Sequence, residues 1–316
     1  MSKCFVAGGA GFIGSHLVDR LLADGHTVTA YDNLSNGRRS FIEGYIGQDN
    51  FQFVEADALN LDALVTAMEG HEVVFHLTAN QDLRVALEDT SVDMYQETVA
   101  TYNVLEAMRR NGVKKIVYTS SGTVYGDTPV IPIPETYGPT HPISLYGAGK
   151  LAGEALITAF CHTFEMQAWM YRFANIIGPR ATHAVMYDFM NKLTENSKEL
   201  EILGDGTQER PFLHVVECVD GVLFGFEHSD DRVNLFNLGC ESFTDIVTVA
   251  EILVQEMGLE NVNFTFTGGS RGWPGDVPRV RCNIDRIKAL GWEPSLTSEG
   301  AVRRTAQEMV AEASGK

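Results

Sequence analysis

The 316-residue sequence predicts an α/β fold, a doubly wound parallel sheet followed by a smaller and irregular C-terminal domain. Short apolar segments alternate with helical patterns through the first half of the chain, and a glycine-rich turn follows the first apolar segment. After residue 178 the alternation becomes irregular. Strands separated by helices pair in parallel through right-handed crossovers, which produces the doubly wound arrangement.

The strands and helices of the first half are predicted from the spacing of apolar residues. Apolar runs predict strands at residues 4–7, 27–31, 51–55, 73–77, 115–119 and 167–173. Helical spacing, as in Leu17, Val18 and Leu21, predicts helices at residues 15–23, 61–68, 92–110 and 146–163. We expect residues 1–178 to form one domain around this sheet.

The rest of the chain, residues 179–316, is expected to form the second domain. Helices are predicted at residues 187–194 and 217–226 and from about residue 298, with a turn at residues 204–206. We expect this domain to pack over the carboxyl ends of the strands, where open α/β sheets bind ligands. Some of its segments are expected to cross back to the first domain.

Composition argues against several classes of function. The net charge of −18 argues against a nucleic-acid partner, because phosphate binding needs a clustered basic surface. No apolar run reaches the roughly 18 residues that span a bilayer, and the first residues lack a signal-peptide pattern, so we expect a cytoplasmic protein without a membrane partner. The five cysteines are scattered and form no CxxC pair, so we expect neither a disulfide framework nor a metal site.

The glycine-rich turn is the first functional signal. Gly8, Gly11 and Gly14 lie directly between a predicted strand and a predicted helix. Glycine allows a tight turn and lets a pyrophosphate approach the backbone, whose N–H groups and helix dipole favour an anion. The pattern therefore predicts the dinucleotide-binding turn of a Rossmann sheet. The alternative is a glycine-rich turn without a ligand.

Two acidic residues at the ends of the next strands indicate which dinucleotide binds. Asp32 follows Gly14 by 18 positions, which suits hydrogen bonds to the adenosine ribose hydroxyls. Because a carboxylate there would repel a 2′-phosphate, NAD is favoured over NADP. Asp57 is placed to reach the adenine amino group, and its alternative role is a helix N-cap.

Tyr146 and Lys150 are the candidate proton-transfer pair. They are four residues apart in a predicted helix and therefore share a face. A nearby ammonium favours the phenolate and lowers the phenol pKa from about 10. Such a tyrosine can take a proton from a sugar hydroxyl while a hydride leaves the same carbon, and Ser121 can hydrogen-bond the same oxygen. The alternative is a chance Tyr–Lys pair.

Taken together, these motifs resemble the extended short-chain dehydrogenase/reductase family, and within it the nucleotide-sugar epimerases typified by UDP-glucose/UDP-galactose 4-epimerase. The motifs that fall in family order are at residues 8–14, 32–34, 57, 76–79, 121–126, 146–150, 172–175, 204–210 and 275–276. The resemblance covers essentially the whole chain. It implies tightly bound NAD that takes a hydride from C4 of the sugar and returns it to the other face of the 4-keto intermediate.

The resemblance also implies which residues make contacts. Cofactor contacts would come from Gly8, Gly11, Phe12, Ile13, Gly14, Asp32, Asn33, Leu34, Asp57, Ala58, Leu77, Thr78, Ala79, Tyr146 and Lys150. Substrate contacts would come from Ser121, Thr123, Tyr146, Asn175, Val185, Arg210 and Asp276. Asn175 would hydrogen-bond the nucleotide diphosphate, and Arg210 would bind it through its planar fork. The alternatives are a loop cap for Asn175 and a solvated surface charge for Arg210.

The residues after Ser121 distinguish the subfamilies. Dehydratases of this family carry Asp-Glu where this chain has Gly122 and Thr123, and UDP-glucuronate decarboxylases carry a glutamate at the second position. Neither glycine nor threonine can supply that acid–base function, so the pattern matches 4-epimerases, with UDP-glucose/UDP-galactose as the default pair. The alternatives are UDP-GlcNAc or UDP-glucuronate as substrate, a sugar-nucleotide dehydratase or reductase, and a non-catalytic NAD sensor.

Several positions depart from the family pattern, and two of them bear on the site. Glu97 stands where a cofactor-contacting asparagine is usual, and Trp273 stands near the place of a pyrophosphate-binding arginine. Arg271 or Arg279 is expected to replace that arginine, and the sequence leaves open which of the two does so.

A homodimer is expected as well, mainly from the resemblance. In that arrangement the predicted helices 92–110 and 146–163 of each subunit would form a four-helix interface. The second of these helices has a face of small residues that suits close packing, formed by Leu151, Ala155, Thr158 and Ala159.

Overall fold

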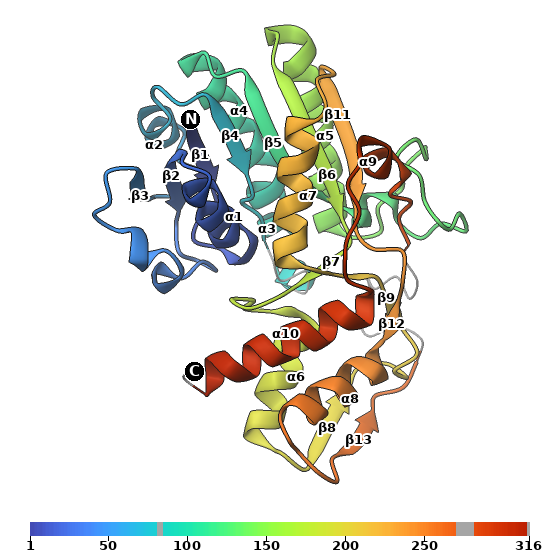
Figure 1. Cartoon of the computed structure of the whole chain (residues 1–316). Helices are drawn as coiled ribbons and strands as arrows, with labels where there is room; N and C mark the ends of the chain where they lie inside the picture. Colours follow the sequence, from blue (N-terminus) through green and yellow to red (C-terminus); the bar gives the residue numbers. More distant parts are fainter. Residues whose placement is uncertain (81–84, 270–280, 315–316) are drawn as a thin grey trace. The chain divides into compact units, whose positions relative to one another are not determined.

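The computed structural model describes residues 1–80, 85–269 and 281–314 (Figure 1). The chain divides into two compact units, each discontinuous in sequence. Unit 1 comprises residues 1–126, 140–172 and 222–236, and unit 2 comprises residues 127–139, 173–221 and 237–316. The predicted boundary after residue 178 therefore lies six residues beyond one change of unit, and further segments cross between the units.

A seven-stranded sheet forms the centre of unit 1, in the order β11-β6-β5-β4-β1-β2-β3. Its strands are β1 (Lys3–Ala7), β2 (Thr27–Asp32), β3 (Phe51–Glu55), β4 (Val73–His76), β5 (Lys115–Ser121), β6 (Gln167–Phe173) and β11 (Val233–Leu238). The pairs β1–β2, β1–β4, β2–β3 and β4–β5 are all parallel. This arrangement confirms the predicted doubly wound fold. The strand order reverses between β1 and β4, the switch point at which such sheets bind ligands.

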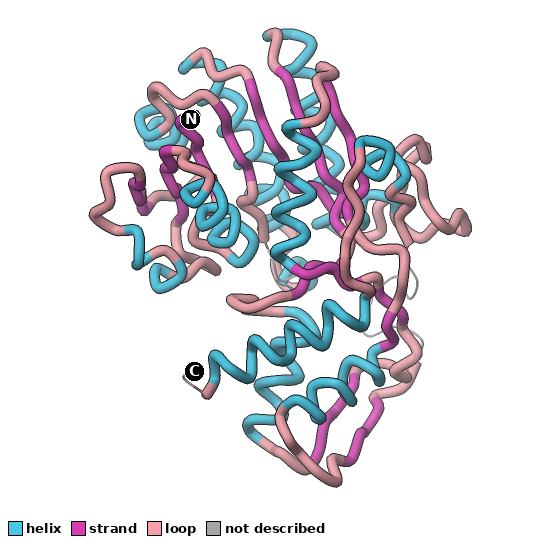
Figure 2. The backbone as a smooth tube through the Cα atoms, viewed as in Figure 1, coloured by secondary structure: helices cyan, strands magenta, loops and turns pink. Residues whose placement is uncertain are grey.

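Helices cover both faces of this sheet. Helix α1 (Phe12–Ala23) lies on one face, whereas α4 (Ala100–Asn111) and α5 (Leu145–Phe164) lie on the other (Figures 1 and 2). Helix α2 (Leu61–Ala67) packs with α4 in the same apolar core. This core excludes water from the second face and fixes the height of α4 and α5 over β4 and β5.

The predicted helix at residues 92–110 is divided into three segments. A short α3 (Ser91–Asp93) leads into a π-helical turn, η4 (Met94–Val99), and then into α4. A π-helical turn places one extra residue in a helical turn, and such turns are frequent at functional sites. The spacing of apolar residues predicted a single α-helix here, because one added residue in a turn does not show in that spacing.

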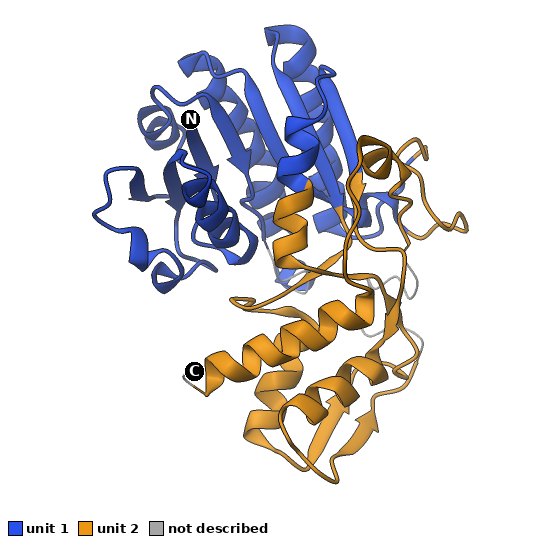
Figure 3. Ribbon diagram, in the orientation of Figure 1, with its two compact units in different colours: residues 1–126, 140–172, 222–236 blue, residues 127–139, 173–221, 237–316 orange. Residues whose placement is uncertain are grey.

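Unit 2 consists of short paired strands and several helices (Figure 3). The strand pairs are β7 (Asn175–Ile177) with β10 (Phe212–His214), β8 (Glu199–Ile202) with β13 (Asn263–Phe266), and β9 (Glu209–Arg210) with β12 (Thr244–Asp245). The helices are α6 (Ala184–Glu195), α7 (Val215–Glu227, which continues into unit 1), α8 (Ile246–Glu256), α9 (Asp285–Leu290) and α10 (Ser298–Ala313). The sequence predicted α6, α7 and α10 but not α8, α9 or these strands.

Within the described residues, the chain contains no helix long and apolar enough to cross a bilayer.

Candidate active site

The glycine turn after β1 leaves no room for side chains. Gly8 has a φ of +84°, and a Cβ there would lie 2.9 Å from the backbone carbon of Leu77. A Cβ on Gly14 would overlap the carbonyl oxygen of Gly8. Gly11 is the N-cap of α1 and has no side chain to accept from the first backbone N–H groups of the helix. The turn therefore fits a pyrophosphate held by backbone N–H groups at a helix N-terminus.

A pocket opens beside this turn at the switch point of the sheet. The predicted cofactor residues that line it are Gly8, Gly11, Asp32, Asn33, Asp57, Ala58, Leu77, Thr78 and Ala79. It is also lined by residues that the sequence did not single out, namely Tyr31, Ser35, Asn36, Gly37, Ala56 and Gln96. The predicted residues outside its lining are Phe12, Ile13, Gly14, Leu34, Tyr146 and Lys150.

Asp32 is held at the pocket by two backbone hydrogen bonds. Its carboxylate accepts the N–H groups of Ala10, at 3.0 Å, and of Leu34, at 2.8 Å. Burial raises the pKa of Asp32, and the two N–H groups oppose that rise. The side chain is thus oriented before any ligand arrives, as a ribose-binding carboxylate requires.

Asp57 follows β3 and lines the same pocket. It accepts a hydrogen bond from the Asn33 amide at 2.9 Å and one from the Leu59 N–H at 2.8 Å. The alternative role as a helix N-cap is wrong, because Asn60 caps α2 by accepting from the N–H of Ala63.

We expect Asp32→Ser to weaken NAD binding and to raise the ratio of NADP to NAD affinity by at least about tenfold, because like charges in contact cost several kcal/mol. Isothermal titration with both dinucleotides measures that ratio. Asp57→Ser, in the same pocket, is the control and should weaken both cofactors equally. If the wild-type protein already binds NADP as tightly as NAD, the ribose assignment of Asp32 is wrong.

Ser121 lies where β5 ends, and Thr123 fixes its hydroxyl. The Thr123 hydroxyl donates to Ser121 Oγ at 3.0 Å, and the Thr123 backbone N–H does so at 3.2 Å. A serine hydroxyl that accepts two hydrogen bonds still has its own proton to donate. A hydrogen bond from Ser121 lowers the pKa of Tyr146, which connects the two candidate catalytic groups.

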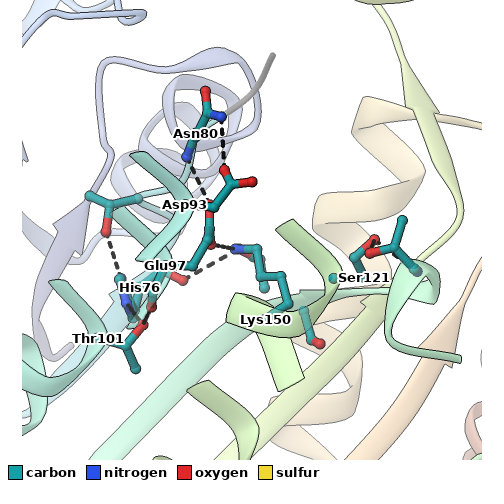
Figure 4. Close-up of polar contacts among 12 residues, drawn as sticks. His76, Asn80, Asp93, Glu97, Thr101, Ser121 and Lys150 are labelled. Carbon is teal, nitrogen blue, oxygen red and sulfur yellow. Dashed lines mark hydrogen bonds and ion pairs between the residues drawn. The ribbon is translucent and has the colours of Figure 1, made fainter. Parts of the chain in front are cut away.

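Lys150 lies between two tyrosine rings and a carboxylate. Its Nζ is 5.5 Å from the ring centroid of Tyr146 and 5.1 Å from that of Tyr118. The same Nζ is 3.0 Å from Oε2 of Glu97, and both side chains are buried (Figure 4). Tyr146 and Lys150 therefore face each other from one side of α5, and Glu97 faces the same ammonium from η4.

The direction of the Tyr146 pKa differs from the expected one. Burial is the main cause that raises it, the carboxylates of Glu97 and Asp93 add to the rise, and only the Ser121 hydrogen bond opposes it. The expectation that Lys150 lowers this pKa did not include a buried carboxylate beside the lysine. Burial, together with the carboxylates of Glu97 and Asp93, therefore favours the protonated phenol.

The predicted substrate residues fall in both units. Ser121, Thr123 and Tyr146 lie in unit 1, whereas Asn175, Val185 and Arg210 lie in unit 2. Asp276 lies outside the described residues, as do Trp273, Arg271 and Arg279.

Within unit 2, Asn175 and Arg210 are close in the strand register. Asn175 in β7 is paired with Phe212 of β10, two residues after Arg210, and is exposed. The Arg210 guanidinium donates to the Glu209 carbonyl at 3.0 Å, and Val185 packs against the apolar core of the unit. The solvated alternative for Arg210 does not describe this half-buried side chain.

Residues 4–239 match the model of the NAD-dependent epimerase/dehydratase family. This chain belongs to that family. NAD as the predicted cofactor is confirmed, and the resemblance to extended short-chain dehydrogenase/reductase epimerases is confirmed as well. Within it, the chain is similar to NAD-dependent nucleotide-sugar epimerases.

Individual relatives are similar over their whole length. A UDP-glucose 4-epimerase from Mycolicibacterium smegmatis is 32% identical, over 96% of this chain and 97% of its own. A crystal structure of a UDP-galactose 4-epimerase is 36% identical, with a TM-score of 0.87 over 98% of this chain and 99% of that one. A UDP-glucuronic acid 4-epimerase from Bacillus cereus, solved with UDP-glucuronic acid and NAD, is 25% identical with a TM-score of 0.89 over 98% and 99%.

Proposed function

We propose that this enzyme is a UDP-sugar 4-epimerase that interconverts UDP-glucose and UDP-galactose. The observation that carries the proposal is the segment after β5, in which Ser121 is followed by Gly122 and Thr123 rather than by carboxylates. The Thr123 hydroxyl hydrogen-bonds Ser121 and offers no acid for loss of water. The names of two similar proteins support the same sugar pair. The second candidate substrate is UDP-glucuronate, and the similarity to the Bacillus cereus UDP-glucuronic acid 4-epimerase supports it.

In the proposed reaction, Tyr146 takes the proton from the C4 hydroxyl of the sugar and later returns it. Ser121 donates a hydrogen bond to the same oxygen and keeps it in line with the phenol. The Lys150 ammonium lies over the Tyr146 ring, and the Glu97 carboxylate pairs with that ammonium and offsets its charge. When bound, NAD supplies the hydride acceptor and donor. The turn at Gly8, Gly11 and Gly14, together with the pocket that includes Asp32 and Asp57, would hold it.

The separate binding roles of the two predicted domains are part of this proposal. The predicted domain of residues 1–178 would bind NAD and that of residues 179–316 most of the nucleotide sugar, with Asn175 from the end of the first range and Arg210 from the second on the diphosphate. A cytoplasmic location without a nucleic-acid or membrane partner likewise stays a prediction from the sequence.

The reaction type is tested by incubating the enzyme with UDP-glucose, UDP-galactose, UDP-GlcNAc and UDP-glucuronate and following the products by NMR. We expect C4 epimers without loss of water or carbon dioxide, and no need for an added reductant. In deuterium oxide C5 should stay unlabelled, because no carboxylate lies beside Ser121 to remove that proton. A 4-keto-6-deoxy product, or deuterium at C5, would contradict the epimerase assignment.

A homodimer is proposed through α4 and α5 of each subunit. Large apolar side chains are exposed near these helices, including Tyr95, Tyr102 and Leu145. On α5, Ala155 and Ala159 are exposed and small, which allows close helix packing. Exposed apolar groups of this kind are covered in most stable assemblies.

We expect light scattering at micromolar concentration to give twice the chain mass of 34.8 kDa. Ala159→Arg should give the single-chain mass, because a long cation cannot be buried between the packed helices. Ala23→Arg, at an exposed alanine in the last turn of α1, is the control and should stay dimeric. A wild-type protein of single-chain mass would refute the dimer.

A further inference from the structure

Glu97 is a buried carboxylate placed directly behind the candidate catalytic pair. It comes from the π-helical turn η4, and its side chain is fully buried. One carboxylate oxygen accepts the backbone N–H of Asn80 at 2.8 Å, and the other is 3.0 Å from the Lys150 ammonium (Figure 4). A buried charge of this kind is retained at a high desolvation cost, which makes its position significant.

The local backbone is built to bring Glu97 to this place. A Cβ on Gly149 would lie 2.6 Å from the Cβ of Glu97, so only glycine lets α5 approach η4 so closely. Gly149 directly precedes Lys150 in the chain. The extra residue of the π-helical turn and this glycine together put the carboxylate at the lysine.

Other ionisable groups surround the pair on every side. From α3, Asp93 accepts a hydrogen bond from the Asn80 amide at 2.9 Å. From β4, His76 stays neutral, because burial and then the Lys150 charge lower its pKa to about 3. From β5 and α5, the rings of Tyr118 and Tyr146 face the ammonium. With one cation against two carboxylates, the cluster favours a protonated Tyr146.

We propose that Glu97 is a positioning residue that holds the Lys150 ammonium and sets the pH at which Tyr146 releases its proton. Because the Lys150 ammonium interacts with the Glu97 carboxylate as well as with Tyr146, it stabilises the phenolate less. Tyr146 therefore releases its proton only at a higher pH. Because it takes Tyr146 to be the acid–base group, this inference rests on the proposed function. The role proposed for Glu97 acts through Lys150 and requires no contact of its own with the sugar.

The direction of the effect follows from charge alone. Removing the Glu97 charge leaves Asp93 as the remaining carboxylate of the cluster, so the Lys150 ammonium acts more strongly on the phenol. An opposite charge within about 4–6 Å lowers a pKa by roughly 1–3 units. Glu97→Gln should therefore move Tyr146 ionisation to lower pH by about one unit or more. A merely structural ion pair would change the unfolding midpoint and leave the titration in place.

The experiment is an ultraviolet tyrosinate titration of the full-length protein, recorded for each variant and for the same variant carrying Tyr146→Phe, so that the difference reports Tyr146. Glu97→Gln is expected to titrate at lower pH than wild type, whereas Glu97→Asp, which keeps the charge, should stay close to wild type. Glu106→Gln removes a carboxylate from α4 that pairs with Arg109 and Arg110, and it is the charge control.

Three results would overturn the proposal. The first is a Glu97→Gln shift no larger than that of Glu106→Gln, and the second is a shift to higher pH. The third is the absence of a tyrosinate signal from Glu97→Gln below its unfolding pH. If Glu97→Gln does not fold, the double variant Glu97→Gln/Lys150→Met removes both charges together. It should titrate near wild type, and a downward shift there would equally overturn the pairing.

Failure of this inference and failure of the proposed function remain distinguishable. The titration needs no substrate, so a shifted titration without turnover of any nucleotide sugar would contradict only the epimerase proposal. Epimerisation with an unshifted titration would contradict only the role of Glu97. Where both hold, the acid limb of the kcat profile should move to lower pH with the titration.

Discussion

Tyr146→Phe is expected to lower kcat by about 10²–10⁴-fold, the usual contribution of a positioned acid–base group. The phenylalanine ring keeps the contact that the Lys150 ammonium makes at 5.5 Å from the ring centroid, and it removes only the hydroxyl that exchanges the proton. Binding of NAD and of the nucleotide sugar should therefore stay near wild type. Steady-state kinetics with titration calorimetry on the same preparations measures both quantities.

Tyr118→Phe is the matched control for this variant. Tyr118 is fully buried, and its ring lies 5.1 Å from the same ammonium, but it belongs to β5 rather than to the helix that carries Tyr146. Loss of its hydroxyl should leave most of the turnover. Retention of more than about a tenth of wild-type activity by Tyr146→Phe would remove Tyr146 from the mechanism.

The first half of the fold could be predicted because its sequence signals are local. Parallel strands buried on both faces appear as continuous apolar runs, and the helices between them show one apolar face. The turn at Gly8 and Gly14 was predictable for a similar reason, since each glycine meets backbone atoms that a Cβ would displace. Unit 2 was harder to predict, because two- to four-residue strands such as β9 and β12 have no periodicity to detect.

Within the site, single residues could be named but their partners could not. The spacing placed Tyr146 and Lys150 on one helical face, yet it did not reveal that Glu97, 53 positions before Lys150, reaches the same ammonium. That contact depends on the π-helical turn and on the close approach at Gly149, neither of which has a sequence periodicity. The expected direction of the Tyr146 pKa was wrong because the spacing reveals neither the burial of the phenol, which is the main cause of the rise, nor the nearby carboxylate of Glu97.

A second buried ion pair supports the segment that carries Ser121. Arg172 donates two hydrogen bonds to Glu154, from Nε at 2.9 Å and from a terminal nitrogen at 2.6 Å, and both residues are about 5% exposed. The Ser120 hydroxyl also donates to Glu154, and the Arg172 guanidinium lies 4.7 Å from the centre of the Tyr125 ring. The pair thus fixes the chain on both sides of Ser121.

Arg172→Met is expected to destabilise the protein by about 3–5 kcal/mol, because it leaves the Glu154 carboxylate buried without its cation. Urea unfolding monitored by circular dichroism measures the loss. Arg20→Met is the matched control: Arg20 forms a 2.8 Å pair with Asp24, but both side chains are more than 40% exposed, so a loss of only about 0–1 kcal/mol is expected.

The double variant Arg172→Met/Glu154→Met separates loss of an ion pair from loss of packing. It removes the uncompensated carboxylate, so it should recover most of the stability that Arg172→Met loses. Turnover should be lower than that of wild type in both variants. The double variant removes Glu154, the acceptor of the Ser120 hydroxyl, and Arg172→Met leaves that acceptor displaced. Ser121 follows Ser120 in the chain and is displaced with it. If Arg172→Met costs no more stability than Arg20→Met, the pair does not anchor this segment, and the position of Ser121 must be fixed by Thr123 alone.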